Sequence, residues 1–217
     1  ATLSPTQQRE WNKVQGRFAD IGFVASAGEM LTLVSQAIRP IQHDEALESI
    51  IRAEAARAVE LDLLPRGINR QAGLLTLTQC APLHPTVSLA LNTLVRSRLA
   101  QNERSLFAFL SSAEPYGFQE YLRRELWSNN GYRPFYRLDD LYDYVRAALG
   151  SGLYSQSQGK HWAEIEDALA RLSPDASVLD ARLIKTIGIL DILGDQRALR
   201  ASAPVLIYAL ADGDITP

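Results

Sequence analysis

The stretch that decides the fold reads QGRFADIGFV at residues 15–24 and continues, after one alanine, as SAGEMLTLVSQAIRP at residues 26–40. Apolar residues among small and polar ones in the first part predict a short, largely buried strand. Ser26 and Glu29 have the spacing of a capping box, so a helix begins there and ends before Pro40. No second convincing strand follows. We therefore predict an all-α domain with at most one short N-terminal strand, which would be the edge of a sheet whose other strands lie elsewhere.

Apolar residues recur at helical spacing through most of the remaining chain. This spacing predicts helices over residues 44–61, 86–100 and 138–149, shorter helices that follow residues 102 and 118, and a short helix near Leu74. Two apolar faces are predicted, formed by Met30, Leu33, Val34, Ala37 and Ile38 and by Leu47, Ile50, Ile51, Ala55 and Ala58. Glu54 falls at the edge of the second face, so that helix is expected to be less securely buried than the others.

The composition is that of an ordinary globular protein. Of the 217 residues 47% are apolar and 22% are charged, and the net charge is −3, which disfavours a broad surface for nucleic acid or anionic lipid. No apolar run approaches the roughly 18 residues of a membrane helix, and the first residues have no signal-peptide pattern. Cys80 is the only cysteine, which excludes an intrachain disulfide and fits a reducing compartment. We expect a cytoplasmic protein.

A loop rich in glycine and serine, GSGLYSQSQG at residues 150–159, divides the chain. We predict a helical domain over residues 1–150, a linker over 151–159, and a small helical domain over 160–217 that ends in a helix-turn-helix or winged-helix-like unit. From residue 160 onward there are six Lys or Arg against nine Asp or Glu, and residues 204–211 contain neither Lys nor Arg. Phosphate contacts would be missing there, so this unit is expected to serve packing and not nucleic-acid binding.

No motif in the sequence supplies a complete catalytic or metal site. Residues 152–160 resemble a phosphate loop only superficially, because Lys160 is followed by His161 and not by Ser or Thr. Cys80 and His84 have the spacing of half a zinc site, but a closed site needs four ligands. Neighbouring carboxylates, such as the pairs at 139–140 and 164–166, are expected in the first turns of helices. The chain alone is therefore not expected to be an enzyme or to bind a cofactor or metal.

Three segments resemble a known family. WNKVQGRFADIGF at residues 11–23, followed by a capped helix, looks like the last core strand and first lid helix of AAA+-type P-loop ATPases. QNERSLFAFL at 101–110 and LIKTIGIL at 183–190 resemble the helical region after the ATPase core of large bacterial ATP-binding proteins, some of them from phage-defence gene clusters. The resemblance implies a lid that couples nucleotide state to subunit contacts, and it places Arg17 nearest to the family's arginine finger. ATP and magnesium would bind only with the missing core.

An alternative hypothesis is a self-contained helical adaptor that binds a protein partner or a second copy of itself. Its groove would be lined by four aromatic residues, with an arginine beside the same apolar helices: Phe107, Phe109, Phe118, Tyr121 and Arg104. A small-ligand enzyme of unfamiliar type ranks last, because no pair of nucleophile and base emerges.

Overall fold

The structure, a computed structural model, describes residues 26–38, 45–96, 104–127, 134–150, 159–193 and 198–211. Its elements are α2 (Ala27–Ala37), α3 (Glu45–Glu60), α4 (Arg70–Gln79), α5 (Pro85–Arg96), α6 (Arg104–Ser111), α7 (Phe118–Trp127), α8 (Leu138–Leu149), α9 (Gly159–Ala170), α10 (Val178–Leu193) and α11 (Ala203–Leu210). These ranges hold no strand, which confirms the all-α prediction. The predicted strand at 15–24, with Arg17, lies outside them.

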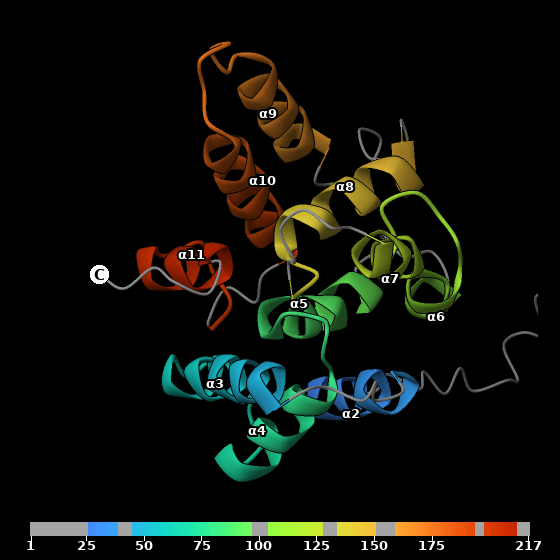
Figure 1. Cartoon of the computed structure of the whole chain (residues 1–217). Helices are drawn as coiled ribbons and strands as arrows, with labels where there is room; N and C mark the ends of the chain where they lie inside the picture. The colour runs from blue at the N-terminus through green and yellow to red at the C-terminus, as the bar shows by residue number, and fades with distance from the viewer. Residues whose placement is uncertain are drawn as a thin grey trace, which may run out of the picture.

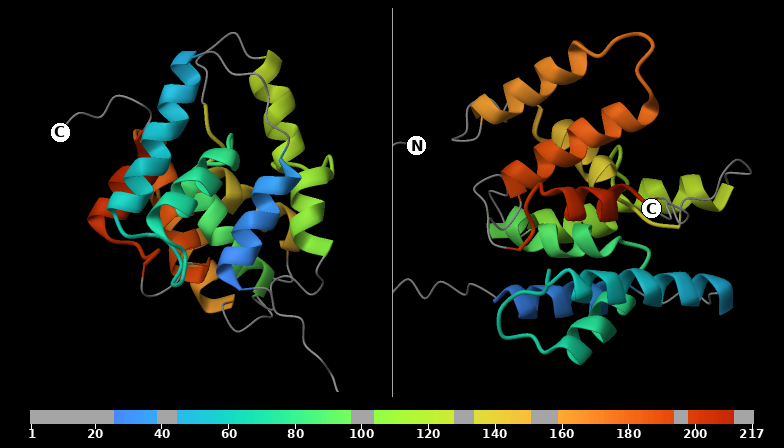
Figure 2. Two further views of the ribbon diagram at one scale, coloured as in Figure 1. Left: turned by 90° about the horizontal axis from the view of Figure 1, so that it is seen from below. Right: turned by 90° about the vertical axis from the view of Figure 1, so that its left-hand side faces the viewer.

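The helices lie in two groups with α5 between them (Figure 1). On one side α4 packs against both α2 and α3, and we call these three helices the α2–α4 layer. On the other side α10 packs against α8, α9 and α11, while α6 and α7 pair with each other. Helix α5 contacts α2 and α3 as well as α6, α8 and α10. The side view in Figure 2 shows the same order, with α9 farthest from the α2–α4 layer.

One hydrophobic core runs through both groups. It contains Leu31 and Val34 of α2, Leu91 of α5, Trp162 of α9 and Leu193 of α10. Residues on both sides of the predicted linker therefore share a core. Of the predicted linker at 151–159, residues 151–158 are outside the described residues and Gly159 begins α9. The division into two domains stays a prediction.

The helix ends follow the sequence signals. Ser26 Oγ accepts from the backbone N–H of Glu29, whose carboxylate accepts from the N–H of Ser26 at 2.6 Å, so the predicted capping box is confirmed. Asn69 Oδ1 caps α4 by accepting from the N–H of Ala72 at 2.7 Å. Gly150 ends α8 with φ of 48°, a left-handed conformation that glycine tolerates best.

One predicted apolar face is rotated in the structure and the other is largely confirmed. In α2, Leu31 is buried while Leu33 is 42% exposed, although Met30 and Val34 are buried as predicted. In α3 the predicted Ile51, Ala55 and Ala58 are buried, and Ile50 is 42% exposed. Sequence spacing gives the period of a helix but not which neighbours it will meet.

The C-terminal part contains the predicted helices but no wing. Helices α10 and α11 pack against each other, and within the described ranges no strand accompanies them. A winged-helix-like ending therefore remains a prediction. No helix in the described part of the chain is long and apolar enough to cross a membrane.

Candidate functional site

His84 is held at the start of α5 by backbone pairing with a distant segment. Its N–H donates to the carbonyl of Tyr136, and the N–H of Tyr136 donates to the carbonyl of Pro82, both at 2.9 Å, around a parallel bridge between Leu83 and Tyr136. Pro85 follows as the first helical residue, a position where its missing N–H costs nothing. The Nδ1 atom of His84 lies 2.7 Å from the Thr86 hydroxyl oxygen and accepts from the backbone N–H of Thr86 at 3.4 Å, so His84 acts as the N-cap of α5.

The His84 ring is fully buried between elements from both groups of helices. Its Nε2 lies 3.4 Å from Oε2 of Glu54 on α3, a carboxylate whose side chain is only 16% exposed. The ring of Tyr208 on α11 lies 4.7 Å away, centroid to centroid, and that of Phe135 lies edge-on at 5.6 Å. The hydroxyl of Tyr208 donates to the Glu54 backbone carbonyl at 2.7 Å, so α3, α5 and α11 meet at this histidine.

The contacts of His84 favour one tautomer. With the proton of the neutral ring on Nε2, that proton faces the Glu54 carboxylate, and Nδ1 accepts from the hydroxyl and the backbone N–H of Thr86. The two atoms are close, yet neither Nε2 nor Oε2 is aligned for a hydrogen bond. Burial lowers the pKa of His84 to about 4, Glu54 opposes that shift, and the nearby Arg137 guanidinium adds to it. His84 is therefore neutral at pH 7.

Buried charges continue from His84 toward α8. Arg137, 2% exposed, donates from its guanidinium to the carbonyl of Ala209 near the end of α11 at 2.8 Å, and its guanidinium carbon lies 5.8 Å from the centre of the Phe135 ring. Asp139, 6% exposed, accepts from Arg182 Nε of α10 at 3.1 Å. We call Glu54, His84, Arg137, Asp139 and Tyr208 the buried polar cluster.

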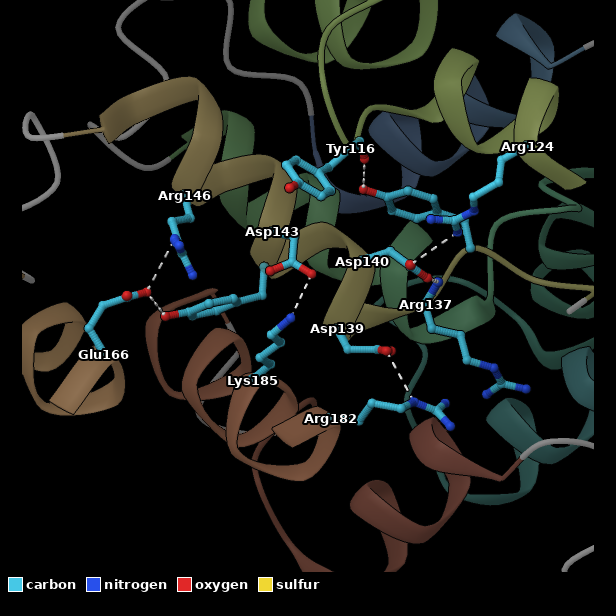
Figure 3. Close-up of polar contacts among 12 residues, drawn as sticks. Tyr116, Arg124, Arg137, Asp139, Asp140, Asp143, Arg146, Glu166, Arg182 and Lys185 are labelled. Atoms are coloured by element: carbon cyan, nitrogen blue, oxygen red, sulfur yellow. Dashed lines mark hydrogen bonds and ion pairs between the residues drawn. The ribbon is translucent and has the colours of Figure 1, made fainter. Parts of the chain in front are cut away.

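The charged side of α8 extends this network to three other helices (Figure 3). Asp140 pairs with Arg124 of α7 at 3.5 Å, and Asp143 with Lys185 of α10 at 2.7 Å. Arg146 pairs with Glu166 of α9 at 3.6 Å. Each pair joins α8 to a different helix, so this side of α8 carries interhelical contacts.

The predicted positions of the acidic pairs are half right. Asp139 and Asp140 occupy the first turn of α8, where the carboxylate of Asp140 accepts from the backbone N–H of Arg137 at 3.0 Å. The prediction for Glu164 and Glu166 was wrong, because α9 begins at Gly159 and places both in its middle. There Glu166 accepts instead from the Tyr142 hydroxyl of α8.

The residues considered for metal or nucleotide binding have other surroundings. Cys80 is buried, its thiol lies 3.9 Å from the Leu31 carbonyl, and burial raises its pKa to about 12. Among the described residues no group of three or more His, Cys, Asp or Glu side chains could hold a metal ion. Lys160 is 85% exposed and lies 3.7 Å from Glu164, one turn along α9.

The predicted interaction residues lie inside the fold where the structure describes them. Phe109, Phe118 and Tyr121 are each less than 5% exposed, and all three rings contact Tyr136. The side chains of Arg104 and Phe107 are outside the described part. The role of these residues in partner binding stays a prediction, and the three described rings are closed off from the surface by their own packing.

An open groove lies on the α2–α4 layer. Its volume is about 620 Å³, and it is lined by Arg52 of α3, by Asn69, and by Gln71, Ala72, Leu74, Leu75 and Thr78 of α4. Leu75 is 60% exposed there. Arg52 bonds to Glu48 on its own helix.

Sequence reasoning missed the buried polar cluster because its members come from four separate elements. The only hint was Glu54, which interrupts the inner edge of an apolar stripe. Comparison with protein-family models, with curated proteins and with solved structures found no match for this chain.

Proposed function

We propose that this chain is a non-catalytic helical lid and interaction region of a larger bacterial P-loop ATPase, which couples nucleotide state to contacts with another subunit or a protein partner in the cytoplasm. The observation that carries the proposal is the place of α5 between the α2–α4 layer and the helices around α10. A helix that contacts both groups is suited to pass a displacement from one to the other, as in rigid-body movements of packed elements.

The buried polar cluster supports a mechanical role. Its charged members lie inside the fold and contact neighbouring helices: Arg137 bonds to α11 and Asp139 to α10. Networks of this kind have discrete arrangements because an unpaired buried charge is costly. They therefore favour movement of whole groups of helices over gradual deformation.

The resemblance to AAA+-type ATPases supplies the nucleotide part of the proposal. The first test is whether the natural gene continues upstream into a phosphate-binding loop. If it does, the complete protein should hydrolyse ATP, and Arg17→Ala should lower kcat at least tenfold while ATP affinity changes less than threefold, as expected for a group that acts on transition-state charge.

Arg66→Ala is the matched control, because Arg66 is exposed on the loop before α4, and it should leave both quantities unchanged. A gene without a phosphate loop would reject the ATPase assignment. Unchanged turnover in Arg17→Ala would reject the arginine-finger role alone.

A further inference from the structure

We propose that the contact among Glu54, His84 and Tyr208 is an acid-sensitive latch, which holds the α2–α4 layer against α11 and is released when His84 takes up a proton. The contact joins α3 to α11 directly, in addition to the packing that passes through α5. It also sits at the N-cap of α5, the helix shared by both groups. Disturbing one side chain therefore affects three elements at once.

The groups that face His84 determine whether its ring can take up a second proton in the closed arrangement. Glu54 of α3 and Asp139 at the start of α8 favour the imidazolium, whereas Arg137 opposes it. Tyr208 of α11 and Phe135 cover the ring, so water cannot solvate the charge. Burial outweighs the two carboxylates, and the closed arrangement therefore disfavours the charged ring.

Protonation also changes the hydrogen bonds at Nδ1. With the single proton of the neutral ring on Nε2, Nδ1 accepts from the hydroxyl and the backbone N–H of Thr86. The incoming proton binds to Nδ1, which then donates to the Thr86 hydroxyl oxygen and can no longer accept from the backbone N–H that it caps. Opening the latch lets water solvate the imidazolium and the freed N–H together.

The direction of the pH effect follows from the two states. In the open state His84 is hydrated and has an ordinary pKa of about 6.5, whereas in the closed state its pKa is about 4. The open state therefore binds more protons between these values. The equilibrium constant for opening should rise up to about tenfold for each pH unit below 6.5 and level off near pH 4.

The latch can be tested by measuring the distance between α3 and α11. Spin labels on Ala53→Cys of α3 and Ala203→Cys of α11 occupy exposed positions, while the native Cys80 is buried. Pulsed electron paramagnetic resonance should give a single distance between the two spin labels at pH 7.5. A longer population should grow between pH 6.5 and 4.5 and disappear when neutral pH is restored. The far-UV circular dichroism should stay helical throughout.

Two histidine variants make the test specific. In His84→Asn an amide oxygen still caps α5 but takes up no proton in this range, so the distance should stay short at pH 4.5. In His161→Asn the replaced ring is half exposed on α9, and the response should match that of the unmodified sequence. A long population in His84→Asn equal to that of the unmodified sequence would overturn the proposal.

Two further results would overturn it. One is an unchanged distance at pH 4.5 in the unmodified sequence. The other is lengthening that occurs only together with loss of helical circular dichroism, since that is global acid unfolding. If His84→Asn does not fold, Tyr208→Phe takes its place: without its bond to the Glu54 carbonyl, opening should begin at higher pH, and an unshifted onset would count against the latch.

Discussion

Two histidines in this protein lie beside carboxylates in very different surroundings. His84 is fully buried 3.4 Å from Glu54, whereas His161 on α9 is 49% exposed and lies 3.2 Å from Asp191 of α10 and 3.6 Å from Glu164. Water and salt screen the exposed group, and such surface pairs contribute between about 0 and 1 kcal/mol. The buried pair has no such screening. A histidine beside a carboxylate therefore supports the structure at His84 and contributes little to stability at His161.

Arg137→Met should have the largest effect on stability, because it removes a charge from the buried polar cluster that contains His84. Methionine keeps much of the volume, but the Ala209 carbonyl loses its donor and the nearby carboxylates lose a positive charge. We expect the free energy of unfolding to fall by about 3 kcal/mol, measured by urea denaturation at pH 7.

The exposed counterpart is Arg171→Met, which breaks an ion pair between the residue after α9 and Asp167 in the last turn of that helix; the arginine side chain is 77% exposed there. It should cost less than about 0.5 kcal/mol. Equal losses in the two variants would contradict the distinction between buried and exposed charge.

The next prediction concerns the contribution of His84 to the pH dependence of the free energy of unfolding. Its folded pKa, about 4, is below the ordinary value of about 6.5, so the unfolded chain binds the extra proton first. The contribution is fully present above pH 6.5 and is lost as pH falls toward 4, by up to about 1.4 kcal/mol per pH unit.

This contribution can be measured with denaturation curves at pH 7, 6, 5 and 4.5 for the unmodified sequence and for His84→Asn. It is the difference between the two proteins in the slope of the free energy of unfolding against pH. Parallel slopes for the unmodified sequence and His84→Asn would show that His84 takes up its proton equally in the folded and unfolded chains.

Tyr208→Phe should have a moderate effect on stability. It removes the hydroxyl that donates to the Glu54 carbonyl at 2.7 Å and keeps the ring that covers His84. The expected cost is about 1 kcal/mol, and thermal unfolding should show it as a lowered Tm. No change in Tm would mean that the carbonyl finds another donor.

The smallest effect is expected for His161→Asn at pH 7. The exposed ring and its two carboxylates are hydrated whether or not they pair, so the free energy of unfolding should change by less than about 0.5 kcal/mol. A larger loss, measured under the same urea conditions, would show that the α9–α10 contact depends on this side chain more than its exposure indicates.

Local signals in the sequence predicted the helices well. Ser26 with Glu29, and Gly150 after α8, mark helix ends because each acts within a few residues along the chain. The buried face of α2 was less predictable, since Leu33 is as apolar as Leu31, which is buried in its place. The sequence offered only Glu54, at the edge of an apolar stripe, as a hint of the candidate site, because Glu54, His84 and Arg137 are far apart in sequence.

The sequence by itself determined the helical character of the described ranges, the caps of several helices and the presence of a single cysteine among these 217 residues. Only the tertiary structure decided which polar groups are buried away from water. Both histidines lie beside carboxylates, yet His84 lies between α3, α5 and α11, whereas His161 lies on α9 and is half exposed. Burial depends on which elements meet in space, and burial sets the energy of a charge. The pKa of His84 is therefore a property of the assembled fold.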